Sequence, residues 1–154
     1  MNKVEIRAEE VPLPAWSDCA ADFCRVVMEQ LRFSRRVLSV LFCGDQFIRA
    51  LNLRFRNVDE STDVLSFPYV EMEGEAASRE EGFVPAGDVV VSLEELRRFA
   101  AEAGVDEALE LRRVLIHGIL HLAGFDHATN EQSEPMLVYQ EALLKELPSW
   151  KMTV

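Results

Sequence analysis

All three histidines of this chain, His117, His121 and His127, lie within one short stretch, HGILHLAGFDH, at residues 117–127. Residues four positions apart lie on the same face of a helix, so His117 and His121 are expected to project side by side. Gly124 can adopt the positive φ that ends a helix with a sharp reversal, which returns His127 toward the other two imidazoles. Three neutral imidazoles around one ion leave a fourth position open, as in catalytic zinc sites.

Zinc is the ion that this ligand set favours, because imidazole suits zinc and neither thiolate nor carboxylate is required. Ligand type alone also allows nickel, copper or iron. A lone histidine on an apolar helix face is usually a core residue, but a third histidine after a helix-ending glycine favours a metal site. Asp126 has two alternative roles, as a hydrogen-bond partner of a ligand histidine or as a polar residue of the turn.

The histidine spacing also matches the H-x-x-x-H-x-x-G-x-x-H frame of metzincin proteases. In those enzymes a glutamate follows the first histidine and acts as the general base that activates the metal-bound water. Gly118 occupies that position in this chain. Peptide hydrolysis by that route therefore lacks its proton acceptor, which argues against a protease.

The composition indicates one globular domain spanning residues 1–154, since 49% of the residues are hydrophobic and 28% are charged. The apolar runs are too short to cross a bilayer, and the first residues carry charges where a signal peptide is apolar. We therefore expect a cytoplasmic protein. Cys19, Cys24 and Cys43 are expected to be reduced, buried thiols, and a metal site at Cys19 and Cys24 is disfavoured by their spacing.

A formal net charge of −11 argues against general nucleic-acid binding, because phosphate recognition rests on a basic surface. Any RNA-binding role therefore needs a local basic site on an acidic body. Delivery of the RNA by the ribosome or another factor is one way to meet this requirement.

Hydrophobic periodicity predicts a single α+β domain, with a mixed sheet of about four strands and one face of the sheet covered by helices. The third and fourth strands are expected to pair antiparallel, and the metal site to lie at the end of a helix. Asp45 is a predicted N-cap, Ser92 and Glu95 form a capping-box pattern, and residues 71–86 suggest a mobile acidic surface loop. Strands are expected near residues 4–6, 36–43, 63–69 and 87–91, and helices near 16–31, 45–55, 92–104, 106–123 and 131–147.

The histidine stretch resembles the signature of the YbeY family of bacterial metal-dependent endoribonucleases. Two further motifs resemble that family in the same order: LNLRFR at 51–56 with STDVLSFP at 61–68, and GDVV at 87–90. Phe55 stands where many members carry tyrosine, and Ser61 where proline is common. Neither difference removes a metal ligand or a charge.

This resemblance implies a single-strand-specific endoribonuclease that matures the 3′ end of 16S rRNA and takes part in ribosome quality control. It implies one Zn²⁺ ion on His117, His121 and His127, and a functional role for Arg56. The implied partners are single-stranded RNA within the small ribosomal subunit and ribosome-associated proteins, with no membrane.

Arg56 has a physical reason for such a role, because a guanidinium matches phosphate oxygens and stabilises charge that develops on a scissile phosphodiester. Arg49 lies seven positions earlier and shares its helix face if the helix persists, with Arg54 nearby. No acidic residue lies between Asp45 and Asp59. Arg49 and Arg54 are therefore further candidates for RNA contacts, with solvated surface charges as the alternative.

Two functions of other classes remain open from the sequence. One is a metallohydrolase or metalloprotease with the metzincin-like frame. The other is a non-catalytic ribosome-assembly factor in which zinc only stabilises the fold. The open fourth ligand position argues against the second, because structural zinc sites are usually closed by four ligands.

Overall fold

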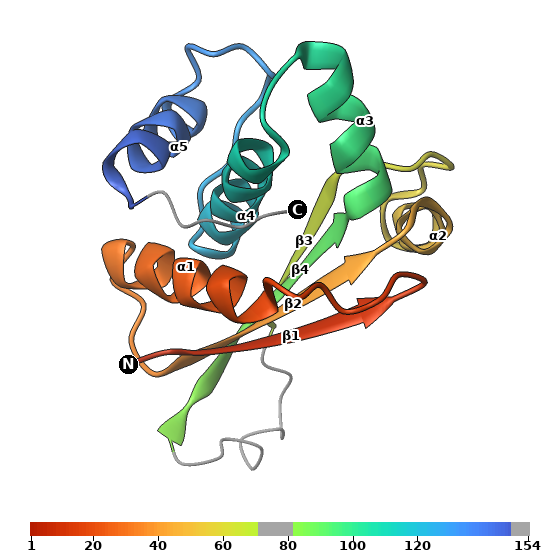
Figure 1. Cartoon of the computed structure of the whole chain (residues 1–154). Helices are drawn as coiled ribbons and strands as arrows, with labels where there is room; N and C mark the ends of the chain where they lie inside the picture. The colour runs from red at the N-terminus through yellow and green to blue at the C-terminus, as the bar shows by residue number, and fades with distance from the viewer. Residues whose placement is uncertain (71–81, 149–154) are drawn as a thin grey trace.

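The structure is a computed structural model that describes residues 1–70 and 82–148. Most of the stretch expected to form an acidic loop, residues 71–81, lies outside the described residues, whereas residues 84–86 belong to a strand. The strands are β1 (Lys3–Glu9), β2 (Arg36–Cys43), β3 (Val64–Pro68) and β4 (Val84–Ser92). The helices are α1 (Ser17–Gln30), α2 (Asp45–Arg56), α3 (Leu93–Ala103), α4 (Glu107–Leu122) and α5 (Pro135–Glu146) (Figure 1).

The four strands form one mixed sheet in the order β1-β2-β4-β3. β1 pairs parallel with β2, and β2 pairs parallel with β4. β3 pairs antiparallel with β4, so the expected antiparallel pair and the mixed sheet are confirmed. β3 lies at one edge of the sheet, which leaves one side of its backbone open to a neighbouring element.

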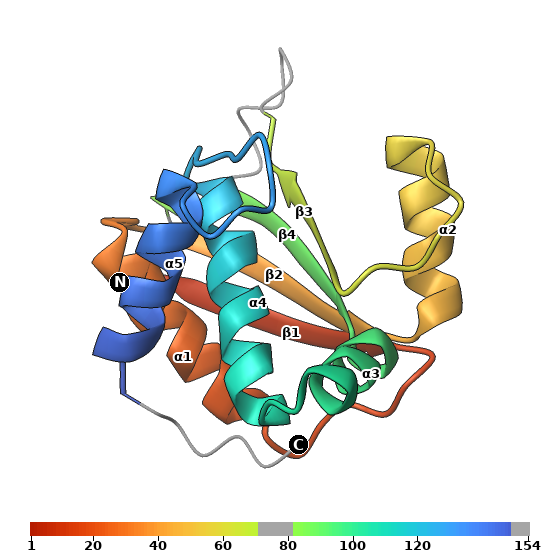
Figure 2. The same cartoon turned by 90° about the horizontal axis from the view of Figure 1, so that it is seen from above.

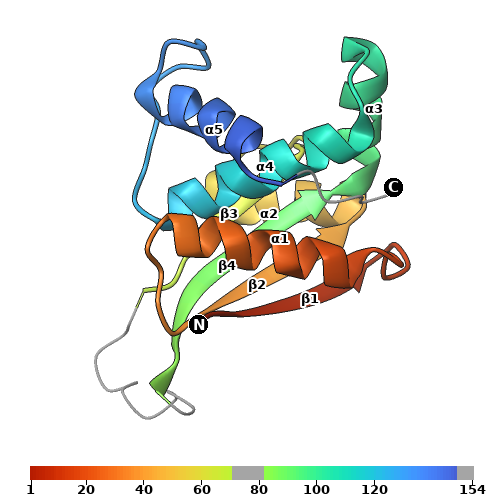
Figure 3. The same cartoon turned by 60° about the vertical axis from the view of Figure 1, so that its left-hand side comes forward.

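One face of the sheet carries the main hydrophobic core. Alternate residues of the central strands, among them Val40 and Phe42 of β2 and Val89 of β4, point to this face and are buried against the helices. Figure 3 shows α1 and α4 lying along this face, with α5 stacked outside α4. The fully buried residues of α4 include Leu111, Leu115, Ile116, Ile119 and Leu120, as expected for a helix enclosed by its neighbours.

Helix α2 packs against the opposite face, at the edge formed by β3. Ile48 of α2 is buried in a small cluster with Leu65 of β3 and Val90 of β4. Figure 2 shows α2 on the far side of β3 from α4 and α5. The sequence predicts helices on one face only, because the periodicity of a helix shows which of its sides is buried but not which face of the sheet it meets.

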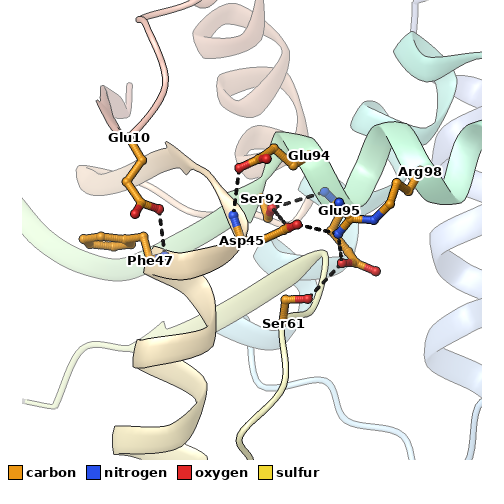
Figure 4. Close-up of polar contacts among 8 residues, drawn as sticks. All are labelled: Glu10, Asp45, Phe47, Ser61, Ser92, Glu94, Glu95 and Arg98. Atoms are coloured by element: carbon orange, nitrogen blue, oxygen red, sulfur yellow. Dashed lines mark hydrogen bonds and ion pairs between the residues drawn. The ribbon is translucent and has the colours of Figure 1, made fainter.

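The N-terminus of α2 is bound by carboxylates from other elements (Figure 4). Glu94 Oε1 accepts a hydrogen bond from the backbone N–H of Asp45 at 3.0 Å, and Glu10 Oε1 accepts one from that of Phe47 at 2.7 Å. The prediction of Asp45 as the N-cap is wrong, because Gly44 takes that position. A Cβ atom on Gly44 would lie 2.2 Å from Glu94 Oε1, so a side chain there would displace the capping carboxylate.

The start of α3 is tied to the start of α2 by the same set of contacts. Ser92 is the N-cap of α3, and its Oγ accepts a hydrogen bond from the backbone N–H of Glu95 at 3.2 Å, as predicted. The Ser92 hydroxyl also donates to Asp45 Oδ1 at 2.9 Å. Arg98 pairs with both Asp45 and Glu95. These contacts fix α2 at its first turn, so the position of its last turn follows from the length of the helix.

Two sequence expectations about the rest of the chain can be compared directly with the structure. Cys19, Cys24 and Cys43 are free thiols, and Cys24 and Cys43 are buried. Burial raises the pKa of Cys24 to about 12, which keeps that thiol protonated. In the part of the chain that the structure describes, none of the helices has the length and apolar character needed to span a membrane.

Candidate metal centre

The structure brings the three histidines together at the C-terminal end of α4. His117 and His121 lie on the helix, and Gly124 follows it with a φ of +98°, which turns the chain back. His127 then lies with its ring centroid 5.2 Å from that of His117 and 5.3 Å from that of His121. One nitrogen of each imidazole lies within 4.8 Å of the others. The helix-ending turn predicted from the sequence therefore produces this convergence.

Each imidazole has a carbonyl oxygen as the partner of its Nδ1 atom. A carbonyl oxygen only accepts hydrogen bonds, so each Nδ1 carries the hydrogen and each Nε2 keeps a free lone pair. This tautomer is the one that binds a metal through Nε2. The partners are Gln140 Oε1 for His117 at 2.7 Å, the Phe125 carbonyl for His121 at 3.1 Å, and the Thr129 carbonyl for His127 at 2.8 Å.

The donor set fits a zinc ion. The Nε2 atoms of His117 and His121 lie 3.1 Å apart, and with hydrogen on both Nδ1 atoms neither Nε2 has a proton to share. Two lone pairs facing each other at this distance need a cation between them. Tetrahedral Zn–N bonds of about 2.0–2.1 Å place ligand nitrogens roughly 3.3 Å apart, close to the observed separation.

Burial also favours the neutral form of two of the imidazoles, His117 and His121. It lowers the pKa of His117, and the neighbouring His127 lowers it further, although the hydrogen bond with Gln140 acts in the opposite direction. Burial likewise lowers the pKa of His121, with His117 as the next cause. Both residues therefore present neutral imidazoles at neutral pH, as metal coordination requires.

A cleft of about 390 Å³ opens beside the histidines and joins segments that are far apart in the sequence. Its lining includes His117 and His121 from α4, Ser66 from β3 and Arg56 from the last turn of α2. Arg56 is thus brought to the same cleft as the imidazoles, as the role implied for it requires. Its Nη2 atom donates a hydrogen bond to the Ser66 carbonyl at 2.8 Å, across the open edge of the sheet.

Gly118 allows α4 to lie close to the sheet. A Cβ atom at this position would lie 2.7 Å from Cγ1 of Val89 and 3.2 Å from Oγ of Ser66. The Ser66 hydroxyl donates a hydrogen bond to the Gly118 carbonyl at 3.3 Å, which fixes the helix against β3. The position that holds the catalytic glutamate in metzincins therefore faces the sheet in this protein and has no room for a side chain.

The other two candidate arginines do not line this cleft. Arg49 pairs with Asp59 at 2.8 Å on the exposed surface. Asp59 follows α2 in the chain and folds back to pair with Arg49, which lies in a stretch of the sequence without acidic residues. The guanidinium of Arg54 lies 5.1 Å from the ring centroid of Phe55. Of these three arginines, only Arg56 lines the cleft beside the candidate metal centre.

Asp126 adopts the turn role of its two alternatives. Its Oδ1 atom accepts a hydrogen bond from the backbone N–H of His127 at 2.8 Å. The side chain that instead hydrogen-bonds a histidine of the candidate metal centre is Gln140 of α5, which sequence reasoning missed. Its signal is a polar residue on an apolar helix face, four positions after the buried Met136 and three before the buried Leu143.

A chain of polar contacts orients the amide of Gln140. Its Nε2 atom donates to Glu141 Oε2 at 3.2 Å, which leaves Oε1 directed to His117. Arg113 donates to the same Glu141 oxygen at 3.1 Å and to the buried Glu110 at 2.5 Å. These contacts couple one face of α5 to the side of α4 that carries His117.

The comparisons with known proteins identify the family. The model of the family described as "Endoribonuclease YbeY" matches residues 3–148. The chain belongs to the endoribonuclease YbeY family. Its three predicted motifs and all the cleft residues named above lie within this match, so the resemblance drawn from residues 51–127 extends over nearly the whole chain.

Curated relatives carry the same family name, and a solved structure shares the fold. A Treponema pallidum protein named Endoribonuclease YbeY is 41% identical over 148 residues, covering 94% of this chain and 89% of the relative. One from Borrelia turicatae is 39% identical over 146 residues, covering 94% and 95%. A solution structure of a Thermotoga maritima protein superposes with a TM-score of 0.59 at 26% sequence identity. The match covers 92% of this chain and 87% of the Thermotoga maritima chain.

Proposed function

We propose that this protein is a zinc-dependent endoribonuclease that cleaves single-stranded RNA. His117, His121 and His127 hold one zinc ion, and Arg56 binds the phosphate that is cleaved. The observation that carries the proposal is a cluster of three imidazoles, two of which line the same cleft as Arg56, in a chain of the YbeY family.

Each residue has a defined task in this proposal. When bound, the zinc ion supplies Lewis acidity, which polarises a phosphate oxygen and acidifies water. The carbonyl partners of the three Nδ1 atoms keep the imidazoles oriented toward the ion. Arg56 is held by the Ser66 carbonyl through one N–H group, and its remaining N–H groups are donors for phosphate oxygens.

We further propose that the substrate is the 3′ end of 16S rRNA within the small ribosomal subunit, in the cytoplasm, with a role in ribosome quality control. The family resemblance supports this assignment. The net charge of −11 is consistent with delivery of the RNA by the ribosome, because the acidic body repels free RNA in bulk.

The two alternatives receive less support. A protease of the metzincin type needs a general base next to the first histidine, and Gly118 has no space for one. A purely structural zinc is usually enclosed by four ligands, whereas His117 and His121 of this three-imidazole cluster line an open cleft.

Incubation of the zinc-loaded protein with fragments of 16S rRNA tests the proposal. We expect cleavage of single-stranded fragments, no cleavage of the same sequence in a duplex, and loss of cleavage after chelation. Analysis of the new 3′ ends distinguishes attack by water from attack by the 2′-OH, since only the latter leaves a cyclic phosphate. Cleavage of a peptide but not of RNA would contradict the proposal.

A further inference from the structure

An aromatic side chain is exposed on the last turn of α2, next to Arg56. Phe55 is 54% exposed and belongs to neither of the hydrophobic clusters among the described residues. Exposing an aromatic ring of this size costs burial free energy that the fold does not recover. The ring is therefore available for contact with another molecule.

Phe55 is nevertheless held in place by two neighbours. Its ring packs against that of Phe67 in an edge-to-face arrangement, with centroids 5.3 Å apart and planes at 62°. The guanidinium of Arg54 lies 5.1 Å from its centroid. We call Arg54, Phe55 and Phe67 the Phe55 surface.

The Phe55 surface continues into the cleft through Arg56. The guanidinium of Arg56 lies 5.6 Å from the ring centroid of Phe67, and Arg56 itself lines the cleft with His117 and His121. Two arginines and two aromatic rings thus form a continuous path from the exposed end of α2 to the candidate metal centre.

The anchoring of α2 makes this surface a defined platform. The first turn of the helix is bound by Glu10 and Glu94, and Asp45 is tied to Ser92 (Figure 4). The last turn lies across β3 from the other helices (Figure 2). A ligand that extends from the cleft over the β3 edge therefore meets Phe55.

We propose that Phe55 stacks on an unpaired RNA base adjacent to the cleaved phosphate, with Arg54 contacting the neighbouring backbone. This inference rests on the proposed function and names how the substrate is recognised. Aromatic rings stack on the faces of unpaired bases, and arginine adds cation–π and phosphate contacts. The bases of a duplex are already stacked on each other, so this contact selects single strands.

Stacking also explains how an acidic protein can bind an anionic substrate. With a net charge of −11, affinity cannot rest on a broad basic surface and counterion release. Base stacking does not depend on net charge. It supplies affinity where only two arginines, Arg54 and Arg56, accompany the aromatic rings.

Binding of a short RNA to the zinc-loaded protein tests this proposal. The RNA carries one 2-aminopurine, whose fluorescence falls when it stacks, and 2′-O-methyl sugars with phosphorothioate linkages to resist cleavage. We expect F55L to bind roughly 5- to 100-fold more weakly and to lose the quenching, because leucine is apolar but has no ring to stack. F55Y is expected to bind and quench like the unaltered protein.

Two further variants separate stacking from other effects. L53A removes another exposed apolar side chain from α2, on the opposite side of the helix, and should leave binding unchanged. R54Q should reduce the slope of log affinity against log salt concentration by about one, whereas F55L should leave the slope unchanged. Circular dichroism confirms that each variant is folded.

The outcomes distinguish this inference from the proposed function. Binding and quenching by F55L equal to those of the unaltered protein would overturn the stacking role, including the case in which the Phe55 surface binds another protein. If the unaltered protein meanwhile cleaves single-stranded RNA, the proposed function stands without it. If the unaltered protein neither binds nor cleaves RNA, both are overturned.

Discussion

Gln140 Oε1 accepts a hydrogen bond from Nδ1 of His117 over 2.7 Å, and this contact joins α5 to the candidate metal centre. The acceptor sets the tautomer of the imidazole, while the contact of Gln140 with Glu141 fixes the orientation of the amide. His117 and Gln140 are 23 positions apart in the sequence, so this contact depends on the packing of α5 against α4.

Replacing Gln140 by leucine is expected to weaken zinc binding by about 10- to 100-fold, because it removes the acceptor that orients His117. Competition with a fluorescent chelator measures the zinc affinity. V138A changes an exposed side chain on the same helix and serves as the control, with no expected change in affinity. Equal zinc affinity of Q140L and the unaltered protein would exclude this positioning role.

Each histidine of the centre is expected to be necessary for stoichiometric zinc. His117→Ala, His121→Ala and His127→Ala should each lose most of the bound metal, because two imidazoles hold zinc far more weakly than three. Metal analysis of the purified variants by mass spectrometry measures this. Retention of one zinc per chain in all three variants would place the metal elsewhere.

Arg56→Ala is expected to separate substrate binding from metal binding. The variant should retain its zinc and its fold, since Arg56 contacts no histidine in the structure and makes one hydrogen bond to Ser66. Its cleavage rate should fall by about 100-fold or more, as for loss of a charged group that stabilises a developing anion. R49Q is the matched control, because Arg49 pairs with Asp59 outside the cleft. Unchanged cleavage by R56A would remove this residue from the mechanism.

Gly118→Ala is expected to destabilise the protein by about 1–3 kcal/mol, because the new Cβ would overlap the side chain of Val89. Urea denaturation of the metal-free variant measures the free energy of unfolding. In a G118A/V89A double variant the overlap disappears, so the two single effects should add to more than the double effect. Simple additivity would show that α4 does not lie against β4 at this point.

Zinc affinity should remain high down to about pH 6.5 and fall at lower pH. Burial lowers the pKa of His117 and His121 below the ordinary histidine value of 6.5, so protons compete with zinc only in more acidic solution. The stability of the metal-free protein should change in the same direction. Below pH 6.5 these two histidines bind protons more readily in the unfolded chain than in the folded one, so the free energy of unfolding decreases. Chelator competition at several pH values measures the first effect. A loss of affinity that begins well above neutral pH would contradict it.

Local patterns in the sequence predicted much of this site. The spacing of His117 and His121 and the position of Gly124 were sufficient to predict the convergence of the imidazoles, because a helix and a glycine-ended turn leave little freedom in between. The mixed sheet, its antiparallel pair and the helix start at Ser92 are also confirmed. The antiparallel pair joins two consecutive strands, and the helix start depends on neighbouring residues.

Features that depend on packing between distant segments were not predicted. The role of Gln140 follows from the way α5 lies on α4, and the pairing of Arg49 with Asp59 follows from the return of the chain after α2. Gly44 and not Asp45 is the N-cap of α2, and the carboxylate of Glu94, from another helix, accepts the hydrogen bond of the Asp45 backbone N–H. Spacing along one helix carries no information on such partners.

Titration of zinc into the metal-free protein, with cleavage of a single-stranded 16S rRNA fragment as the readout, tests the central claim most directly. We predict that activity is absent without metal, rises in proportion to the added zinc, and saturates at one ion per chain. Full activity of the metal-free protein, or saturation with zinc without any cleavage of RNA, would contradict it.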